Sequence, residues 1–122
     1  MMTDESRVSR LHVGPRLSEV AVHNGTVYLA GQIAEHTKAD AFEQTREVLG
    51  HVERLLGEAK SDKRHILSAT VFLSNMKNYA DMNRAWDGWV EPGATPPRAT
   101  VEAKLARSDC LVEIQIIAAQ IV

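Results

Sequence analysis

The sequence predicts an α+β fold in which two helices cover one face of a mixed β-sheet. Segments with alternating apolar and polar residues, typical of strands, lie near both ends of the chain and at its centre. Two longer segments instead place apolar residues at helical spacing. The helical segments lie between strands, so each helix should form a right-handed crossover that joins parallel strands.

The N-terminal part of the chain is predicted to form strands only. Residues 8–13 form a short first strand. Residues 18–23 and 26–33 flank an Asn-Gly pair, which is the strongest short signal for a β-hairpin. The second arm of this hairpin contains Gly31, where the backbone can approach a ligand closely. A bulge or a bend in the strand is the plainer explanation of this glycine.

Two amphipathic helices follow, separated by a strand. The first begins after Asp40, whose spacing to Glu43 is typical of a capping box, and its apolar stripe runs for about five turns. Residues 65–74 form the strand. The second helix begins near Asn78 and ends before Pro92. Its apolar stripe contains both tryptophans and is more typical of a hydrophobic core than of a cofactor site.

The C-terminal region is predicted to contain two strands, at residues 95–105 and 111–120, joined as an antiparallel hairpin. A double proline holds the start of the first strand extended immediately before Arg98. The guanidinium of Arg98 is therefore presented by a stiff segment, which suits it to clamp a carboxylate or an oxyanion.

The alternation also predicts a register for this hairpin. Matching the apolar faces pairs Val101 with Ile116, and therefore Lys104 with Glu113. In this register Arg98 and Glu113 point to the same face but lie roughly 20 Å apart along the strands. The two side chains could then serve one site only if a second subunit brought them together.

The same face predicts an oligomer for a second reason. Ile117, Ala119 and Ile121 lie on it among charged residues, so it does not resemble a solvated sheet face. Both predicted helices are needed to cover the opposite face. Contact between subunits is the natural cover for the face that remains.

Length and composition limit the function classes. The 122 residues are expected to form one domain, residues 1–122, and a net charge of -2 without a basic block predicts no nucleic-acid partner. The N-terminus has no apolar signal region, and no segment reaches membrane-spanning length, so we expect a cytoplasmic protein. The single cysteine, Cys110, excludes an internal disulfide, and a reactive role for it is not favoured.

No metal or cofactor motif is found. The five histidines are scattered without metal-ligand spacing, and no Walker loop, dinucleotide fingerprint or nucleophile elbow is present. The remaining candidates are Arg98, Glu113, the Thr100 hydroxyl and the Gly31 backbone, a set suited to binding a small carboxylate with a water beside it. The alternative is that Arg98 makes a structural ion pair and Glu113 only pairs with Lys104.

Several segments resemble, in the same order, the RidA (reactive intermediate deaminase, YjgF-type) family. They are Gly31-Gln32-Ile33, Thr70-Val71-Phe72-Leu73, Asp81-Met82-Asn83, Pro97-Arg98-Ala99-Thr100-Val101 and Val112-Glu113-Ile114. The resemblance covers nearly the whole chain, and its last two segments are the most specific. Within this family the sequence is similar to the YoaB-like branch in two segments, Asp40-Ala41-Phe42-Glu43-Gln44-Thr45 and Met82-Asn83-Arg84-Ala85-Trp86-Asp87.

The resemblance implies a chorismate mutase-like fold assembled as a homotrimer with clefts between subunits. It also implies hydrolysis of enamines and imines (2-iminoacids) to 2-oxo acids and ammonia, without a cofactor. By this resemblance Arg98 holds the substrate carboxylate, and Glu113 orients or deprotonates the attacking water. Gly31 and the backbone of Thr100 would contact the substrate. Asn83 matches a family asparagine, although its place near a helix start also allows a structural role.

Two positions depart from the family pattern. Arg16 replaces the tyrosine of a Gly-Pro-Tyr segment; it could add a positive charge suited to a diacid, or it could simply be solvated. Thr100 replaces a frequent cysteine, so a thiol role is excluded there. Two other function classes stay open: a non-catalytic trimer that binds 2-oxo acids, and a ribonuclease or translation inhibitor, which the acidic net charge disfavours.

Overall fold

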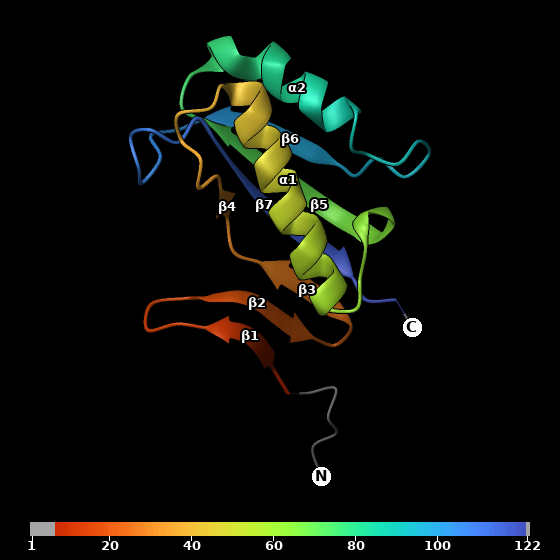
Figure 1. Cartoon of the computed structure of the whole chain (residues 1–122). Coiled ribbons are helices and arrows are strands. Elements are labelled where there is room, and N and C mark those ends of the chain that lie inside the picture. The colour runs from red at the N-terminus through yellow and green to blue at the C-terminus, as the bar shows by residue number, and fades with distance from the viewer. Residues whose placement is uncertain (1–6, 122) are drawn as a thin grey trace.

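The computed structural model describes residues 7–121 and has the predicted α+β architecture (Figure 1). Its strands are β1 (Ser9–Val13), β2 (Ser18–His23), β3 (Thr26–Leu29), β4 (Gln32–Ile33), β5 (Ile66–Leu73), β6 (Arg98–Glu102) and β7 (Val112–Ala119). Its helices are α1 (Ala41–Glu58) and α2 (Tyr79–Asp87), with short 3₁₀ turns at η2 (Lys63–His65) and η3 (Met76–Asn78). The strand order is β1-β2-β3-β7-β5-β6, and β4 also pairs with β7.

The hairpin predicted at the Asn-Gly pair is confirmed as β2–β3. His23 pairs with Thr26 across a two-residue turn, and both turn residues, Asn24 and Gly25, have positive φ angles of 51° and 77°. The second arm differs from the prediction because it is interrupted at residues 30–31. Its first part, β3, pairs with the end of β7, and its second part, β4, pairs with the beginning of β7.

Both helices lie on one side of the sheet, as predicted (Figure 1). The side chain of Asp40 caps α1 by accepting a hydrogen bond from the backbone N–H of Glu43 at 2.9 Å. The apolar stripe of α1 packs on the sheet, and each fully buried Leu or Val contributes about 1.5–3 kcal/mol. The core formed in this way includes Val48, Leu49, Val52, Leu55 and Leu56 of α1 and Val20, Val27, Val71, Ile114 and Ile116 of the sheet.

The predicted hairpin between the last two strands is wrong, because β5 lies between β6 and β7. Phe72 of β5 has Val101 as its partner on one side and Glu113 on the other. The pairs Val101–Ile116 and Lys104–Glu113 therefore do not form. The alternation of a strand shows which of its residues share a face, but it does not show which strand lies beside it.

The predicted crossovers are partly confirmed. β5 and β6, which are joined through α2, form a parallel pair. The crossover through α1 joins β4 to β5, and both of these strands pair antiparallel with β7 from opposite sides. These two strands therefore run in the same direction without being neighbours, because β7 takes the central position between them.

The helix-free face of the sheet carries apolar side chains that no part of the described chain covers fully. Tyr28 is 46% exposed and Val101 is 42% exposed, while Phe72 and Ile117 are half-buried. Tyr28 pairs with Ile117, and Phe72 pairs with Val101, so these side chains lie together in two groups on one surface. This face is the one for which the sequence predicts contact between subunits.

Glu47 of α1 holds the segment between β4 and α1. Its carboxylate accepts hydrogen bonds from the backbone N–H groups of Glu35 (2.6 Å) and His36 (3.2 Å). It also contacts the rings of His36 and His51, each at 3.0 Å. Burial raises the pKa of this carboxyl, but the hydrogen bonds from Glu35, His36 and His51 outweigh burial and lower the pKa from 4.5 to about 2.

We expect Glu47→Gln to lower the free energy of unfolding at pH 7 by about 1.5–3 kcal/mol, the usual value of hydrogen bonds to a charged group. Because the pKa of the folded state is depressed, this contribution is present above pH 4.5 and is lost as the pH falls towards 2. Urea unfolding of both proteins from pH 7 to pH 3 measures the difference. A difference that does not shrink at low pH would contradict the assignment.

Candidate functional site

Glu113 and Gly31 lie together on the helix-free face of the sheet. Glu113 is at the start of β7, between Ile33 of β4 and Phe72 of β5. Its carboxylate lies so close to the backbone of Gly31 that a Cβ atom at Gly31 would overlap Glu113 Oε2. The absence of a side chain at Gly31 therefore makes room for the Glu113 carboxylate, and the strand is also interrupted there.

We expect Gly31→Ala to displace the Glu113 carboxylate without unfolding the protein. The added methyl group would meet the end of a flexible side chain, and Gly31 does not have the positive φ that strains an alanine. If Glu113 acts on the substrate, a displacement of about 1 Å costs roughly 100-fold in turnover. Thermal unfolding and turnover measure the two effects separately.

Gly50→Ala is the matched control for this substitution. Gly50 lies in α1, and a methyl group added to it would meet nothing within 4 Å. This change should stabilise the protein by about 0.5–1 kcal/mol and leave turnover unchanged. Normal turnover in Gly31→Ala would contradict a role for the contact between Gly31 and Glu113.

Arg98 lies on the other face of the sheet, beneath α2. It begins the edge strand β6 level with Ala69, a buried residue whose side chain faces the helices. The Arg98 guanidinium carbon is 5.1 Å from the centroid of the Trp86 ring, and its Nη1 is 3.8 Å from Met82 Sδ. Contact with the Trp86 ring holds the planar guanidinium in one orientation. Sequence reasoning assigned both α2 residues to the core and did not associate them with Arg98.

The prediction that Arg98 and Glu113 share a face is therefore wrong. Along β5, Arg98 is level with Ala69 and Glu113 is level with Phe72, an offset of about 10 Å along the strands. β5 also separates their strands, which adds roughly 10 Å across the sheet. The two side chains cannot meet within one chain, so a shared site still requires a second subunit.

The charges of Arg98 and Glu113 are both uncompensated. Neither side chain has an ion pair or an oxygen or nitrogen hydrogen-bond partner among residues 7–121. Every other half-buried Asp, Glu, Lys or Arg in this range has such a partner: Glu19, Glu47, Asp62, Lys63 and Glu91. Because partial burial of an unpaired charge is unfavourable, this pattern is typical of a binding site rather than of structural ion pairs.

The other candidate residues are Thr100 on β6, Asn83 on α2 and Arg16 between β1 and β2. Thr100 lies two residues after Arg98 on the same face of β6, and its hydroxyl is buried without a hydrogen-bond partner among the described residues. Asn83 is half-buried in the middle of α2, not near its start as predicted. Arg16 is exposed in the segment between β1 and β2. We call Arg98, Thr100 and Asn83 the Arg98 half-site, and Gly31 and Glu113 the Glu113 half-site.

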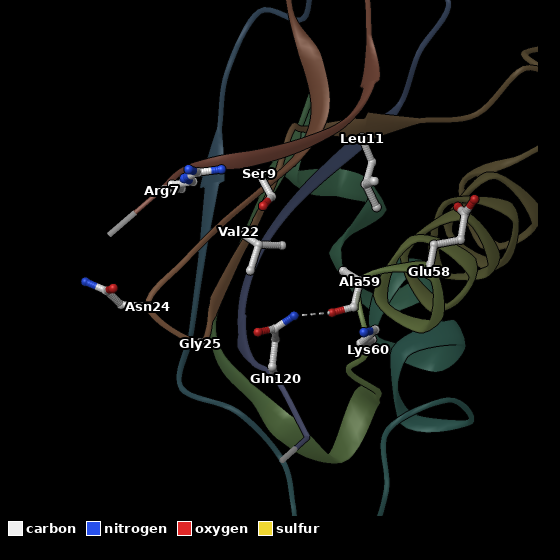
Figure 2. Close-up of a pocket in the computed structure, with 10 residues that line it drawn as sticks. All are labelled: Arg7, Ser9, Leu11, Val22, Asn24, Gly25, Glu58, Ala59, Lys60 and Gln120. Carbon is white, nitrogen blue, oxygen red and sulfur yellow. Dashed lines mark hydrogen bonds between the residues drawn. The ribbon is translucent and has the colours of Figure 1, made fainter. Parts of the chain in front are cut away.

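Two pockets of the single chain contain neither Arg98 nor Glu113. Figure 2 shows one of about 400 Å³ between β1, the β2–β3 turn and the end of α1, where Gln120 Nε2 donates to the carbonyl of Ala59 at 3.0 Å. Another, of about 320 Å³, borders Gly31 and is lined by His51, Arg54 and Arg107. Neither is lined by Arg98 or Glu113, so neither contains the two unpaired charges.

Three further features concern metal-binding side chains, the single cysteine and helices long enough to span a membrane. Within residues 7–121 no group of three or more His, Cys, Asp and Glu side chains could hold a metal ion. Cys110 is buried, and this burial raises the pKa of its thiol, which disfavours a reactive thiolate. No helix in the described range is long and apolar enough to cross a membrane.

Comparison with known proteins identifies the family. The family model described as Endoribonuclease L-PSP matches residues 9–120. A RutC family protein of Haemophilus ducreyi is 48% identical over 112 residues, covering 92% of this chain and 96% of that protein. The chain belongs to the RutC family, which is also called the YjgF or RidA family.

Further relatives support the YoaB-like branch and the fold. The RutC family protein YoaB of Escherichia coli is 43% identical over 112 residues, covering 92% of this chain and 97% of YoaB. The crystal structure of NMB1025 from Neisseria meningitidis, a member of the YjgF protein family, is 42% identical. It superimposes with a TM-score of 0.94, covering 97% of this chain and 98% of that one. This RutC family chain therefore has the chorismate mutase-like fold that the resemblance implied.

Proposed function

We propose that this protein hydrolyses reactive enamines and imines, the 2-iminoacids, to 2-oxo acids and ammonia. The observation that carries the proposal is the pair of uncompensated charges, Arg98 and Glu113, on opposite faces of one sheet. A guanidinium without a counter-ion suits a substrate carboxylate, and a carboxylate without a counter-ion suits a water or a transferred proton. Membership of the RidA family supports the same assignment.

We propose a homotrimer in which the Arg98 half-site of one subunit faces the Glu113 half-site of the next. The exposed apolar groups of the helix-free face support such contact. Light scattering at micromolar concentration should therefore give three times the mass of the 13.5 kDa chain. A monomeric mass would contradict both the assembly and the shared site.

In the proposed reaction Arg98 binds the substrate carboxylate through two parallel hydrogen bonds. Glu113 of the neighbouring subunit orients a water molecule. It accepts one proton of this water as the water oxygen bonds to the protonated imine carbon. Glu113 then returns this proton to the amino group of the resulting carbinolamine. The carbon–nitrogen bond breaks, ammonia leaves, the hydroxyl proton passes to water and the 2-oxo acid remains. No cofactor is required, because a protonated imine carbon is already electrophilic.

The other candidate residues would complete the cleft. The Thr100 hydroxyl and backbone lie beside Arg98, where they can contact the substrate carboxylate. Gly31 leaves room for the Glu113 carboxylate itself, and its backbone would contact the substrate beside that carboxylate. Asn83 would line the α2 side of the cleft. Arg16, which is exposed between β1 and β2, would add a positive charge suited to diacids only if the assembly brings it to this cleft.

The direct test of this function is an assay with freshly generated 2-iminoacids, followed by ammonia or 2-oxo acid release. The protein should accelerate release above the spontaneous rate in water. An unchanged rate, together with binding of 2-oxo acids, would favour the alternative of a non-catalytic metabolite-binding trimer. This alternative uses Arg98 in the same way but needs no base at Glu113.

The family model's description names an endoribonuclease, so RNA is a second possible substrate. The net charge of -2 does not favour it, because nonspecific RNA binding depends on cationic surface. Titration with an oligonucleotide at several salt concentrations should show no salt-dependent binding. Strong oligonucleotide binding that weakens steeply with salt would support an RNA substrate instead.

A further inference from the structure

The strand beside Glu113 is too short to hold its own position. β4 contains only Gln32 and Ile33, and Ile33 pairs directly with Glu113. Two-residue pairing of this kind contributes little stability, so the position of β4 depends on the segments around it. The segment that follows it, residues 34–40, and the segment that precedes β7, residues 103–111, meet beside α1. Whatever joins these segments therefore affects both β4, which flanks the carboxylate, and β7, which carries it.

Gln44 of α1 joins them. Its side chain is completely buried, and its Nε2 lies within hydrogen-bond distance of the carbonyls of Thr37 (3.2 Å), Ala39 (3.1 Å) and Asp109 (3.3 Å). Its Oε1 accepts from the backbone N–H of Leu111 at 2.9 Å. All four partners are backbone groups, so the amide is matched to the path of the chain rather than to particular side chains.

A second bond links the same two segments at the surface. The hydroxyl of Thr37 donates to Asp109 Oδ2 at 2.7 Å. Leu111, held by Gln44, lies two residues before Glu113, and its carbonyl accepts from the backbone N–H of Ser74 after β5. The bonds made by Gln44 therefore run from α1 to the start of β7 on one side and to the segment after β4 on the other.

The neighbouring residue shows what an ordinary buried polar side chain does in this helix. Thr45 is equally buried, but its hydroxyl donates to the carbonyl of Ala41 in its own helix at 2.7 Å. It touches neither segment through a hydrogen bond. Gln44 and Thr45 therefore differ in their hydrogen-bond partners although they are adjacent in one helix and equally buried.

We infer that Gln44 is a positioning residue, which acts through the backbone of Leu111 and of residues 37–39 to hold the Glu113 carboxylate against Gly31. This inference rests on the proposed role of Glu113 in turnover. It also gives a physical reason for the glutamine in the segment Asp40 to Thr45, by which the sequence resembles the YoaB-like branch. A buried network of this kind keeps one geometry only while every member is satisfied.

The test compares Gln44→Met with Thr45→Val in the assembled protein. Gln44→Met keeps the length of the side chain and removes its hydrogen bonds, whereas Thr45→Val keeps the shape and removes one bond within the helix. The Gly31 amide signal in an NMR spectrum reports the position of the Glu113 carboxylate without any substrate. Affinity for a 2-oxo acid and turnover of a 2-iminoacid complete the measurement.

Gln44→Met should shift or broaden the Gly31 signal and lower turnover by about 10–100-fold, while 2-oxo acid affinity changes little. Thr45→Val should leave the Gly31 signal and turnover unchanged at a temperature where both variants are folded. An unchanged Gly31 signal in Gln44→Met, or equal losses of turnover in both variants, would overturn the inference.

Two further variants keep the inference testable if Gln44→Met does not fold. Thr37→Val removes the exposed link alone, whereas Asp109→Asn weakens this link and also removes the ion pair of Asp109 with Arg107 at 3.2 Å. Both should produce smaller changes in the same direction. If the wild-type protein shows no turnover of any 2-iminoacid, the proposed function fails. The Gly31 signal then still decides whether Gln44 positions Glu113.

Discussion

Glu113→Gln is expected to lower turnover of 2-iminoacids by about 10²–10⁴-fold, the usual contribution of a positioned general base. The substitution keeps the size of the side chain and much of its hydrogen bonding but removes the proton acceptor. Binding of a 2-oxo acid should largely survive, because Arg98 lies on the other half-site. Turnover and product affinity, measured on the same preparation, separate these two effects.

The fold should tolerate this substitution. Glu113 has no cationic partner among residues 7–121, so no ion pair is lost when its charge is removed. Glu53→Gln is a matched control, since Glu53 is an exposed α1 carboxylate that pairs with Lys63 at 3.7 Å. Intact turnover in Glu113→Gln would show that Glu113 is not the base. Dissociation of the trimer would show that its carboxylate is structural.

Arg98→Lys is expected to weaken both 2-oxo acid binding and turnover. Lysine keeps the positive charge but has no planar fork, so it cannot make two parallel hydrogen bonds to a carboxylate or stack in the same way on Trp86. Loss of a charge-assisted hydrogen bond costs about 1.5–3 kcal/mol, which corresponds to roughly 10–100-fold in affinity. Calorimetric titration with a 2-oxo acid measures this change.

Arg84→Lys is the control for Arg98→Lys. Arg84 also lies over an aromatic ring: its guanidinium carbon is 4.0 Å from the centroid of the Phe42 ring. Arg84 belongs to neither half-site. This variant should bind the 2-oxo acid as the wild-type protein does. Normal binding by Arg98→Lys itself would contradict the carboxylate clamp.

Mixed trimers test whether the two charges belong to one site. If each cleft combines Arg98 of one subunit with Glu113 of the next, co-assembly of Arg98→Lys and Glu113→Gln subunits creates some clefts in which both residues are wild type. Partial recovery of turnover on mixing is therefore expected. Turnover no higher than the average of the two separate variants would show that the residues do not share a cleft.

Local sequence patterns predicted the elements of this fold because their causes are local. The helical spacing and the Asp40 cap identified α1, and the Asn-Gly pair, which readily adopts positive φ angles, identified the β2–β3 turn. The same patterns identified β6 and β7 but paired them wrongly. A strand's alternation is the same whether its partner is next in the chain or is contributed by an earlier segment such as β5.

The sequence by itself determined the fold class, the family and the chemical types present at the candidate site, including Arg98, Glu113 and Gly31. Only the tertiary structure decided how these residues are arranged. Insertion of β5 between β6 and β7 turns Arg98 towards Trp86 and leaves Glu113 on the other face beside Gly31. The hydrogen bonds of Gln44 also could not be predicted from the sequence. Its backbone partners lie in two distant segments, which become neighbours only when the sheet and α1 pack together.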